Sequence, residues 1–378
     1  MADQERRSIA IAGAWGYIGQ KFIEAGRVLD YDIYVFDPGP IPAAIDPAWV
    51  TRLEDEQAFY ALDADLFHLA LHPEHRDTAL DALLPRSVSE CIHILNEKPL
   101  VSPESPEVCE ELVKRIEGSN ATVLFDFPEL FDPITAKIFE YLDGFDAYTL
   151  TEVRIQRSKD REDPDNPRNH KRMVPIQFQE SVHCLAFLLN LVAHGSDSLG
   201  DALASGITVQ ASSSPYDAPN PEDYPYIVDG RCDYDAQIGD LRVIGHTDFK
   251  RNAPFRKERI IRGVGDGKPF EIQVDYLEGA KYLMINGEDQ SCPPWASSYT
   301  AVLNGFRELS STVPRSSLMA GVFPNPAFAW HTYQLSSLVW RASYDGVEKS
   351  VDSATELLSF EGGFAGEVSR FPTYGGWG

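Results

Sequence analysis

Short apolar runs alternate with amphipathic helical stretches over the first 125 residues of the chain. The apolar runs predict strands at 6–13, 31–37, 64–71, 90–97 and 121–133, and the amphipathic stretches predict helices at 18–30, 53–62, 75–87 and 105–120. Ser105, Pro106 and Glu107 supply a cap, a first-position proline and an early acid, so the last of these helices is predicted to start at Pro106. Strands that are apolar on both faces and alternate with helices indicate a parallel doubly wound sheet.

The pattern changes after residue 126. A helix at 133–144, a strand at 148–158 and an apolar helix at 179–195 are followed by alternating segments at 206–214, 232–249, 258–279 and 280–287. Alternation of polar and apolar residues between Gly- and Asp-containing turns indicates antiparallel pairing. Late helical segments at 298–311 and 327–343 are expected to pack onto this second sheet.

We therefore expect an α/β protein with an N-terminal Rossmann domain and a C-terminal α+β domain built on a mostly antiparallel sheet. A chain of 378 residues is too long for one typical core, which also favours two domains. The expected boundaries are 1–127 for the first domain, 128–355 for the second and 356–378 for a surface tail.

Composition narrows the functional classes. The net charge of −25 argues against nucleic acid and anionic membranes as partners, and no run approaches the roughly 18 apolar residues that a membrane helix needs. The acidic excess fits either a salt-rich habitat or an ordinary acidic surface. Five scattered cysteines indicate a reducing compartment, the cytoplasm. Arg6 and Arg7 before an apolar run resemble a short signal peptide, but the run is better explained as the first strand.

The first candidate for chemistry is the glycine loop "IAIAGAWGYIGQKF" between the first strand and helix. Gly13, Gly16 and Gly19 would let the backbone approach a pyrophosphate at the helix N-terminus, although a tight turn without ligand has the same pattern. Asp37 ends the second strand, where an acid accepts hydrogen bonds from ribose hydroxyls and repels a 2′-phosphate, so NAD is favoured over NADP. Asp37 is equally a turn residue in Asp-Pro-Gly. The loop residues expected at the cofactor are Gly13, Trp15, Gly16, Tyr17 and Ile18.

Two later strand ends should border the same crevice, because the carboxyl ends of parallel strands face the ligand. Leu71, His72 and His75 follow one of these strands, and the two histidines are either cleft residues or parts of an ordinary capping segment. We predict no metal site there, since the histidines lack an independent carboxylate and histidine partner. Glu97 and Lys98 end the other strand, in "HILNEKPL", and either line the crevice or are solvated strand-end charges. A lysine there can bind a substrate hydroxyl and a cofactor ribose.

Taken together, the glycine loop, "LALHPEHR", "EKPL" and "GVGDGKPFEI" resemble the Gfo/Idh/MocA family of glucose–fructose oxidoreductase and inositol dehydrogenase over residues 7–345. The resemblance implies a Rossmann domain joined to an antiparallel sheet domain, with NAD or NADP used on sugars, polyols and related carbonyl compounds. It implies an active-site role for Lys98.

The family's D-x-G-x-H stretch is matched by "QESVH", which puts His183 in the histidine position as the acid or base partner of Lys98. Gln179 stands where the family has Asp, and the neighbouring Glu180 is expected to orient His183 from one helix face. A structural His on an apolar helix is the alternative for His183. Lys171 is a weaker candidate for binding an acidic substrate group.

Two departures leave other functions open. The first glycine pair is spaced as in dihydrodipicolinate or semialdehyde reductases, and the missing Asp also fits a non-catalytic nucleotide-binding sensor. A semialdehyde dehydrogenase would need a cysteine nucleophile beside the nucleotide loop, and the sequence offers none at a strand end there. An antiparallel sheet with one open face favours a homodimer or homotetramer.

Overall fold

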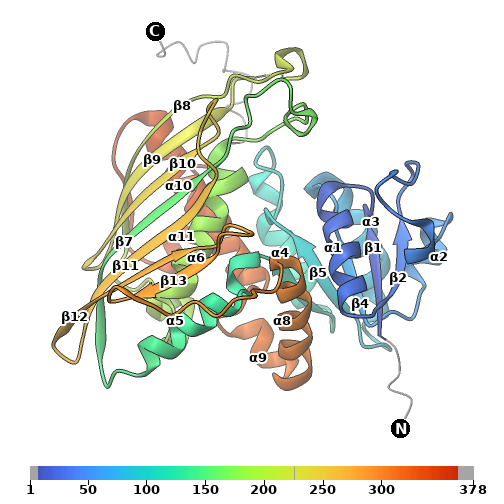
Figure 1. Cartoon of the computed structure of the whole chain (residues 1–378), viewed down its shortest axis with the longest axis horizontal. Helices are drawn as coiled ribbons and strands as arrows, with labels where there is room; N and C mark the ends of the chain where they lie inside the picture. The colour runs from blue at the N-terminus through green and yellow to red at the C-terminus, as the bar shows by residue number, and fades with distance from the viewer. Residues whose placement is uncertain (1–6, 225, 365–378) are drawn as a thin grey trace. The chain divides into compact units, whose positions relative to one another are not determined.

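The computed structural model describes residues 7–224 and 226–364 and divides into two compact units (Figure 1). Of the described residues, the first unit comprises 7–102, 108–132 and 296–329, and the second comprises 103–107, 133–224, 226–295 and 330–364. The second stretch of the first unit ends at residue 132, close to the predicted domain boundary after 127. The return of 296–329 to the first unit was not predicted.

The sheet of the first unit has six parallel strands among the described residues, in the order β3-β2-β1-β4-β5-β6. Its strands are β1 (Ser8–Ala12), β2 (Asp32–Phe36), β3 (Thr51–Arg52), β4 (Leu66–Leu69), β5 (His93–Glu97) and β6 (Thr122–Asp126). The order reverses between β1 and β4, which is the point where doubly wound sheets bind ligands at their carboxyl edge. The predicted parallel Rossmann sheet is confirmed.

The helices between these strands are α1 (Tyr17–Val28), α2 (Glu56–Tyr60), α3 (Arg76–Arg86) and α4 (Cys109–Glu117). The predicted start of α4 at Pro106 is wrong by one short turn. Pro106–Val108 forms a 3₁₀ turn and the α-helix begins at Cys109. Helix N-termini commonly tighten in this way, and the proline fits the first position of either turn.

One face of this sheet packs against α1 and α8 (Ser298–Thr312) in a single apolar core. Ile11, Leu95 and Leu124 contribute from the strands, and Val302 and Phe306 contribute from α8. The expectation that this helix packs onto the second sheet is therefore wrong. An apolar stripe shows that a helix is covered, but it does not show which sheet covers it.

The sheet of the second unit has nine strands within residues 133–224 and 226–364, in the order β14-β13-β12-β11-β7-β10-β9-β8-β15. They are β7 (Tyr148–Ser158), β8 (Ile207–Pro215), β9 (Asp229–Ile238), β10 (Leu241–Asp248), β11 (Arg256–Gly265), β12 (Lys268–Asp275), β13 (Tyr282–Ile285), β14 (Glu288–Asp289) and β15 (Lys349–Val351). Only β7 and β10 pair in parallel among these described strands. The mostly antiparallel sheet is confirmed, and β15 was not predicted.

Helices of the second unit cover one face of this sheet (Figure 1). They are α5 (Pro133–Asp143), α6 (Val182–Val192), α7 (Leu199–Ala202), the part of α10 (Pro326–Asp345) from Trp330 onward and α11 (Ala354–Leu358), while α9 (Arg315–Ala320) belongs to the first unit. The continuous helix predicted from residue 179 instead begins with a π-helical turn, Gln177–Ser181. Such turns in α-helices are frequent at functional sites.

The predicted tail is packed over its first part. Phe364 is fully buried, with its ring 5.1 Å from those of Tyr226 and Trp340. Residues 365–378 lie outside the described residues, as does the signal-like start up to Arg6. Across residues 7–224 and 226–364, no helix combines the length and the apolar character required to cross a bilayer.

Candidate active site

The glycine loop forms a tight connection between β1 and α1 at the point where the strand order reverses. Gly13 has φ +73, and a Cβ there would lie 2.5 Å from the carbonyl oxygen of Ala70. A Cβ on Gly19 would lie 2.4 Å from the carbonyl oxygen of Gly13, so both positions need glycine. A loop of this shape lets a backbone approach an anion at the start of the helix, although a tight turn without ligand shares the same geometry.

Asp37 ties the end of β2 to this loop. Its carboxylate accepts the Trp15 backbone N–H at 3.0 Å and the Gly39 N–H at 2.9 Å. The Trp15 indole N–H donates to the Gly39 carbonyl at 3.0 Å. Tyr17 begins α1 with an exposed side chain, and Ile18 packs against the core.

Arg52 was missed by the sequence reasoning. Pairing of β2 with β3 sets Val35 opposite Arg52, whose guanidinium donates to the Asp37 carbonyl at 3.4 Å. A cation close to the acid that is predicted to bind the ribose bears on the choice between NAD and NADP. No arginine follows Asp37 directly in the sequence, whereas the fold supplies one from the adjacent strand.

Arg76 joins the two loops expected at the crevice. It is 2% exposed, and its guanidinium donates to the carbonyls of Leu71 at 3.1 Å, Pro99 at 2.6 Å, Lys98 at 3.3 Å and Leu100 at 3.4 Å. Burial lowers its pKa to about 10, against the opposing effect of Glu97, so it stays charged at neutral pH. The loop that carries Lys98 is therefore fixed to the loop after β4 by one buried cation.

His72 precedes the 3₁₀ turn Pro73–His75 and His75 is its last residue, and both side chains are exposed. Neither forms a side-chain cap on the helix that follows it, and the contact between them is the His75 N–H to His72 carbonyl bond of 2.9 Å. Lys98 is half-buried after the last residue of β5. The predicted crevice residues thus follow two neighbouring strands, as expected.

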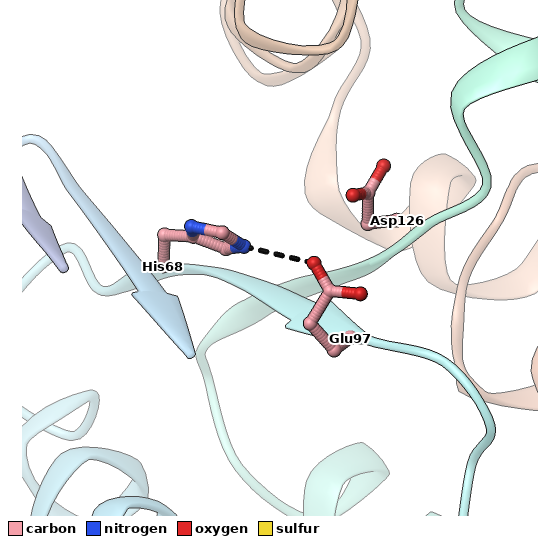
Figure 2. Close-up of side chains that lie close together, drawn as sticks. All are labelled: His68, Glu97 and Asp126. Carbon is pink, nitrogen blue, oxygen red and sulfur yellow. Dashed lines mark hydrogen bonds and ion pairs between the residues drawn. The ribbon is translucent and has the colours of Figure 1, made fainter. Parts of the chain in front are cut away.

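Three buried polar side chains meet at the carboxyl edge of the same sheet (Figure 2). His68 is opposite Leu95 on the neighbouring strand and Glu97 is opposite Asp126, which puts all three polar side chains on one face. The His68 Nε2 lies 3.1 Å from Glu97 Oε1, and one donor atom of each residue lies within 4.8 Å of the others. His68, Glu97 and Asp126 are 0%, 8% and 2% exposed.

The two carboxyls of this group differ in proton affinity. Burial and the Glu97 charge raise the pKa of Asp126 well above its usual value. Burial acts in the same direction on Glu97, but the hydrogen bond and charge of His68 oppose it and, with the effects of Asp126 and Lys98, lower the pKa of Glu97. The three side chains are of metal-ligand type, and the hydrogen bond that the structure gives among them joins His68 to Glu97.

The second unit holds a different buried group at the end of β7. Glu180, in the π-helical turn, accepts a bond of 2.5 Å from Arg157 Nε and also pairs with Lys159. Burial lowers the pKa of Lys159 well below its usual value; Arg157 and Arg161 lower it further, and Glu180 opposes them. The sequence predicted Glu180 as the residue that orients His183, and it missed both basic partners.

The remaining predicted residues lie near this turn. His183 is buried in the first turn of α6 and Gln179 is half-buried in the π-helical turn. Lys171 is exposed, and its carbonyl accepts the Tyr224 hydroxyl at 3.2 Å. Glu180 lies in the π-helical turn and His183 in the α-helix that follows it, so the regular α-helical spacing behind the predicted pairing does not apply between them.

Comparison with known proteins identifies the fold. No protein-family model matches the chain, and no curated protein matches it in sequence. A putative myo-inositol dehydrogenase from Sinorhizobium meliloti is 14% identical with a TM-score of 0.65, covering 91% of this chain and 99% of its own. GenD2 from gentamicin A biosynthesis, solved with NAD, is 13% identical with a TM-score of 0.64 over 92% and 97%.

A super-repressor mutant of Gal80p from Saccharomyces cerevisiae is 11% identical with a TM-score of 0.70, covering 94% of this chain and all of its own. Identities this low show the fold alone. The expected resemblance to Gfo/Idh/MocA proteins is confirmed at that level: the chain has the fold of myo-inositol dehydrogenase, and Gal80p has it too.

Proposed function

We propose that the chain is an NAD(P)-dependent oxidoreductase that transfers hydride between nicotinamide and a carbinol or carbonyl carbon. The substrate class is a sugar, a polyol or a sugar derivative. The observation that carries the proposal is the position of Lys98, which follows β5 at the carboxyl edge of a parallel sheet on a loop that Arg76 holds in place. The fold shared with myo-inositol dehydrogenase supports the same class.

The glycine cradle fits a dinucleotide, since side chains at Gly13 and Gly19 would fill the space next to the loop backbone. Residues from Gly13 to Ile18 would hold the pyrophosphate, and Asp37 would bind the adenosine ribose. The bound nicotinamide would accept or give the hydride. Lys98 would hold the substrate hydroxyl and exchange its proton, and His183 is the residue of the second unit proposed as an acid or base.

The first experiment measures reduced nicotinamide by absorbance, with NAD or NADP, across sugars and polyols at low and high salt. Lys98→Ala should lower kcat about 10²- to 10⁴-fold, the usual contribution of general acid–base catalysis. Lys114→Ala is the matched control, because that lysine is 70% exposed on α4. Full turnover by Lys98→Ala would overturn the mechanism.

The cofactor is proposed to be NAD, because the Asp37 carboxylate would repel a 2′-phosphate. Asp37→Ser should shift the NADP/NAD ratio of kcat/KM toward NADP by about tenfold, the size expected for losing a charged hydrogen bond. Arg52→Leu in the same background should reverse the shift, since Arg52 lies at the Asp37 carbonyl. An unchanged ratio in both variants would place the adenosine ribose elsewhere.

A nucleotide-binding sensor is the second candidate, and Gln179 in place of the family's Asp favours it. The fold is also that of Gal80p, whose solved form is named a super-repressor mutant. Firm NAD binding without turnover on the whole panel, unaffected by Lys98→Ala, would favour this function. A semialdehyde dehydrogenase is less well supported, because the exposed thiol of Cys91 precedes β5 and so lies at its amino end.

We also propose a homodimer or homotetramer formed through the open face of the second sheet. That face carries cross-strand ion pairs such as Arg242–Asp235 at 2.6 Å and Arg262–Glu271 at 2.7 Å. Salt screens exposed charges of this kind, so association should strengthen as ionic strength rises. Light scattering after size exclusion at low and high salt tests it, and a monomer at both would reject it.

A further inference from the structure

We propose that Glu97 and Asp126 share one proton and form, with His68, a buried acid group that exchanges protons with Lys98. The sharing of the proton follows from the structure of the first unit alone. The exchange with Lys98 rests on the proposed function.

The short distance between the two carboxyls indicates one proton for the pair. Glu97 and Asp126 are register partners at the ends of β5 and β6, both are buried, and a carboxyl oxygen of each lies within 4.8 Å of the other. Two ionised carboxylates this close at a buried site would repel strongly, and neither could donate a hydrogen bond to the other. A proton on one of them removes both penalties.

The neighbouring donors decide which carboxyl keeps the proton. His68 Nε2 lies 3.1 Å from Glu97 Oε1 and donates to it, which favours the ionised form of Glu97. Asp126 Oδ1 is buried and has no hydrogen-bond partner in the part of the chain that is described. An unpaired oxygen costs less on a neutral acid than on a carboxylate, which assigns the proton to Asp126.

Charged and titratable groups face the pair from every element around it. They are His68 on β4, Lys98 after β5, Arg76 on α3, Tyr17 on α1 and Tyr299 on α8. Arg76 directs its donors to backbone carbonyls, so its charge is not paired with either carboxyl by a hydrogen bond that the structure gives. Lys98 is the cation whose charge acts on both Glu97 and Asp126.

Two tyrosines lie near the group, one of them at the surface of α1. Tyr299 interacts electrostatically with Tyr17, Asp126 and Glu97. Tyr17 is 45% exposed at the start of the helix. The buried acid is therefore close to a tyrosine whose neighbour reaches solvent.

The proton balance in the oxidation direction is simple. The substrate O–H bond would break as an N–H bond forms on the Lys98 amine, and a bound nicotinamide would take the hydride. The Lys98 N–H bond then breaks as an O–H bond forms on Glu97, which restores the amine. The second proton of the pair finally leaves to solvent, and carbonyl reduction runs the same steps in reverse.

Infrared spectroscopy tests the shared proton on the full chain without substrate or cofactor. The C=O stretch of a protonated carboxyl should be present at neutral pH and disappear in Asp126→Asn, which has the shape of the neutral acid. Asp77→Asn is the control, since that carboxylate is 75% exposed, and it should leave the band unchanged. No such band at neutral pH, or a band that persists in Asp126→Asn, would overturn the proposal.

The exchange with Lys98 is tested by pH profiles once a substrate is found. Asp126→Asn should lower kcat about tenfold and move its pH dependence, with KM nearly unchanged, and Asp126→Glu should restore much of both. An unchanged profile would limit the pair to a structural role and overturn the exchange. If no substrate is turned over, the infrared result still decides whether the proton is shared, so the two failures are distinguishable.

Discussion

Each unit of the molecule buries a group of ionisable side chains, and the two groups have opposite composition. In the first unit two carboxyls and an imidazole meet at the ends of parallel strands, at His68, Glu97 and Asp126. In the second unit one carboxylate, Glu180, is paired with two cations, Arg157 and Lys159. One buried group has an excess of acid and the other an excess of base.

The difference between the two groups shows how burial changes the pKa of a surplus acid and of a surplus base. Desolvation disfavours the charged form, so the surplus acid Asp126 has a raised pKa and the surplus base Lys159 a lowered one. Both shifts bring a buried side chain closer to proton exchange at neutral pH. The acid-rich surface of the protein does not determine these pKa shifts, because the partners around each buried side chain decide whether its pKa rises or falls.

Removal of Glu180 should give the largest effect. Glu180→Ala leaves the buried Arg157 and the half-buried Lys159 without their shared carboxylate, and the loss of one partner of a buried pair costs about 3–5 kcal/mol. Urea unfolding of the full chain in high salt would measure it. Asp235→Ala is the control, because its pair with Arg242 is about half exposed and should contribute below about 1 kcal/mol.

A loss from Glu180→Ala no larger than that of the control would mean that Arg157 and Lys159 reach water in the native protein. The buried group would then behave as a surface pair, and the contrast between the two units would fail. Glu180→Gln separates charge from shape, since it keeps the side-chain length and removes the charge.

The second prediction concerns Arg76, a buried cation of the first unit that donates to backbone carbonyls and not to carboxylates. Arg76→Leu should cost about 2 kcal/mol, because four backbone carbonyls lose a charged donor while one buried charge is removed. The same variant should weaken NAD binding, since the Lys98 loop is no longer tied to the loop after β4. Calorimetric titration with NAD and urea unfolding would measure the two effects.

Arg115→Leu is the control for Arg76. Its guanidinium pairs with Asp77 at 3.0 Å on the exposed surface, so it should change neither quantity much. Equal NAD affinity in Arg76→Leu and the wild type would show that the loop keeps its place without the buried cation.

The smallest expected effect is on the slope of the unfolding free energy against pH, which the two groups change in opposite directions. Asp126 has a raised folded pKa, so its contribution is complete below the unfolded value of about 3.9 and is lost as pH rises through the folded pKa. Lys159 has a lowered folded pKa, so it destabilises below that value, and the cost disappears as pH approaches about 10.4.

Unfolding free energies measured between pH 5 and pH 9 would give this slope. The range of about four pH units lies between the two unfolded pKa values. Asp126→Asn should make stability rise more with pH than in the wild type, and Lys159→Met should make it rise less. A shift of the same sign in both variants would contradict the assigned directions.

Much of the first unit was predictable from local pattern. The glycine loop, Asp37 and Lys98 each follow or precede an apolar run, so their place at the carboxyl edge of a parallel sheet could be inferred. His68 and Asp126 carried a signal that was not used: each is a polar residue in an otherwise apolar strand run. Arg76 and Lys159 carried no comparable signal, because each lies among other charged residues.

The sequence by itself determined the alternation of strands and helices, the two kinds of sheet and the tight turn at Gly13, since periodicity and glycine geometry are local properties. Only the tertiary structure decided which distant side chains meet. The order of the strands brings His68, Glu97 and Asp126 together, the β2–β3 pair brings Arg52 to Asp37, and the chain's return places α8 on the first sheet. Strand order and register depend on packing across the whole unit, so a local pattern does not contain them.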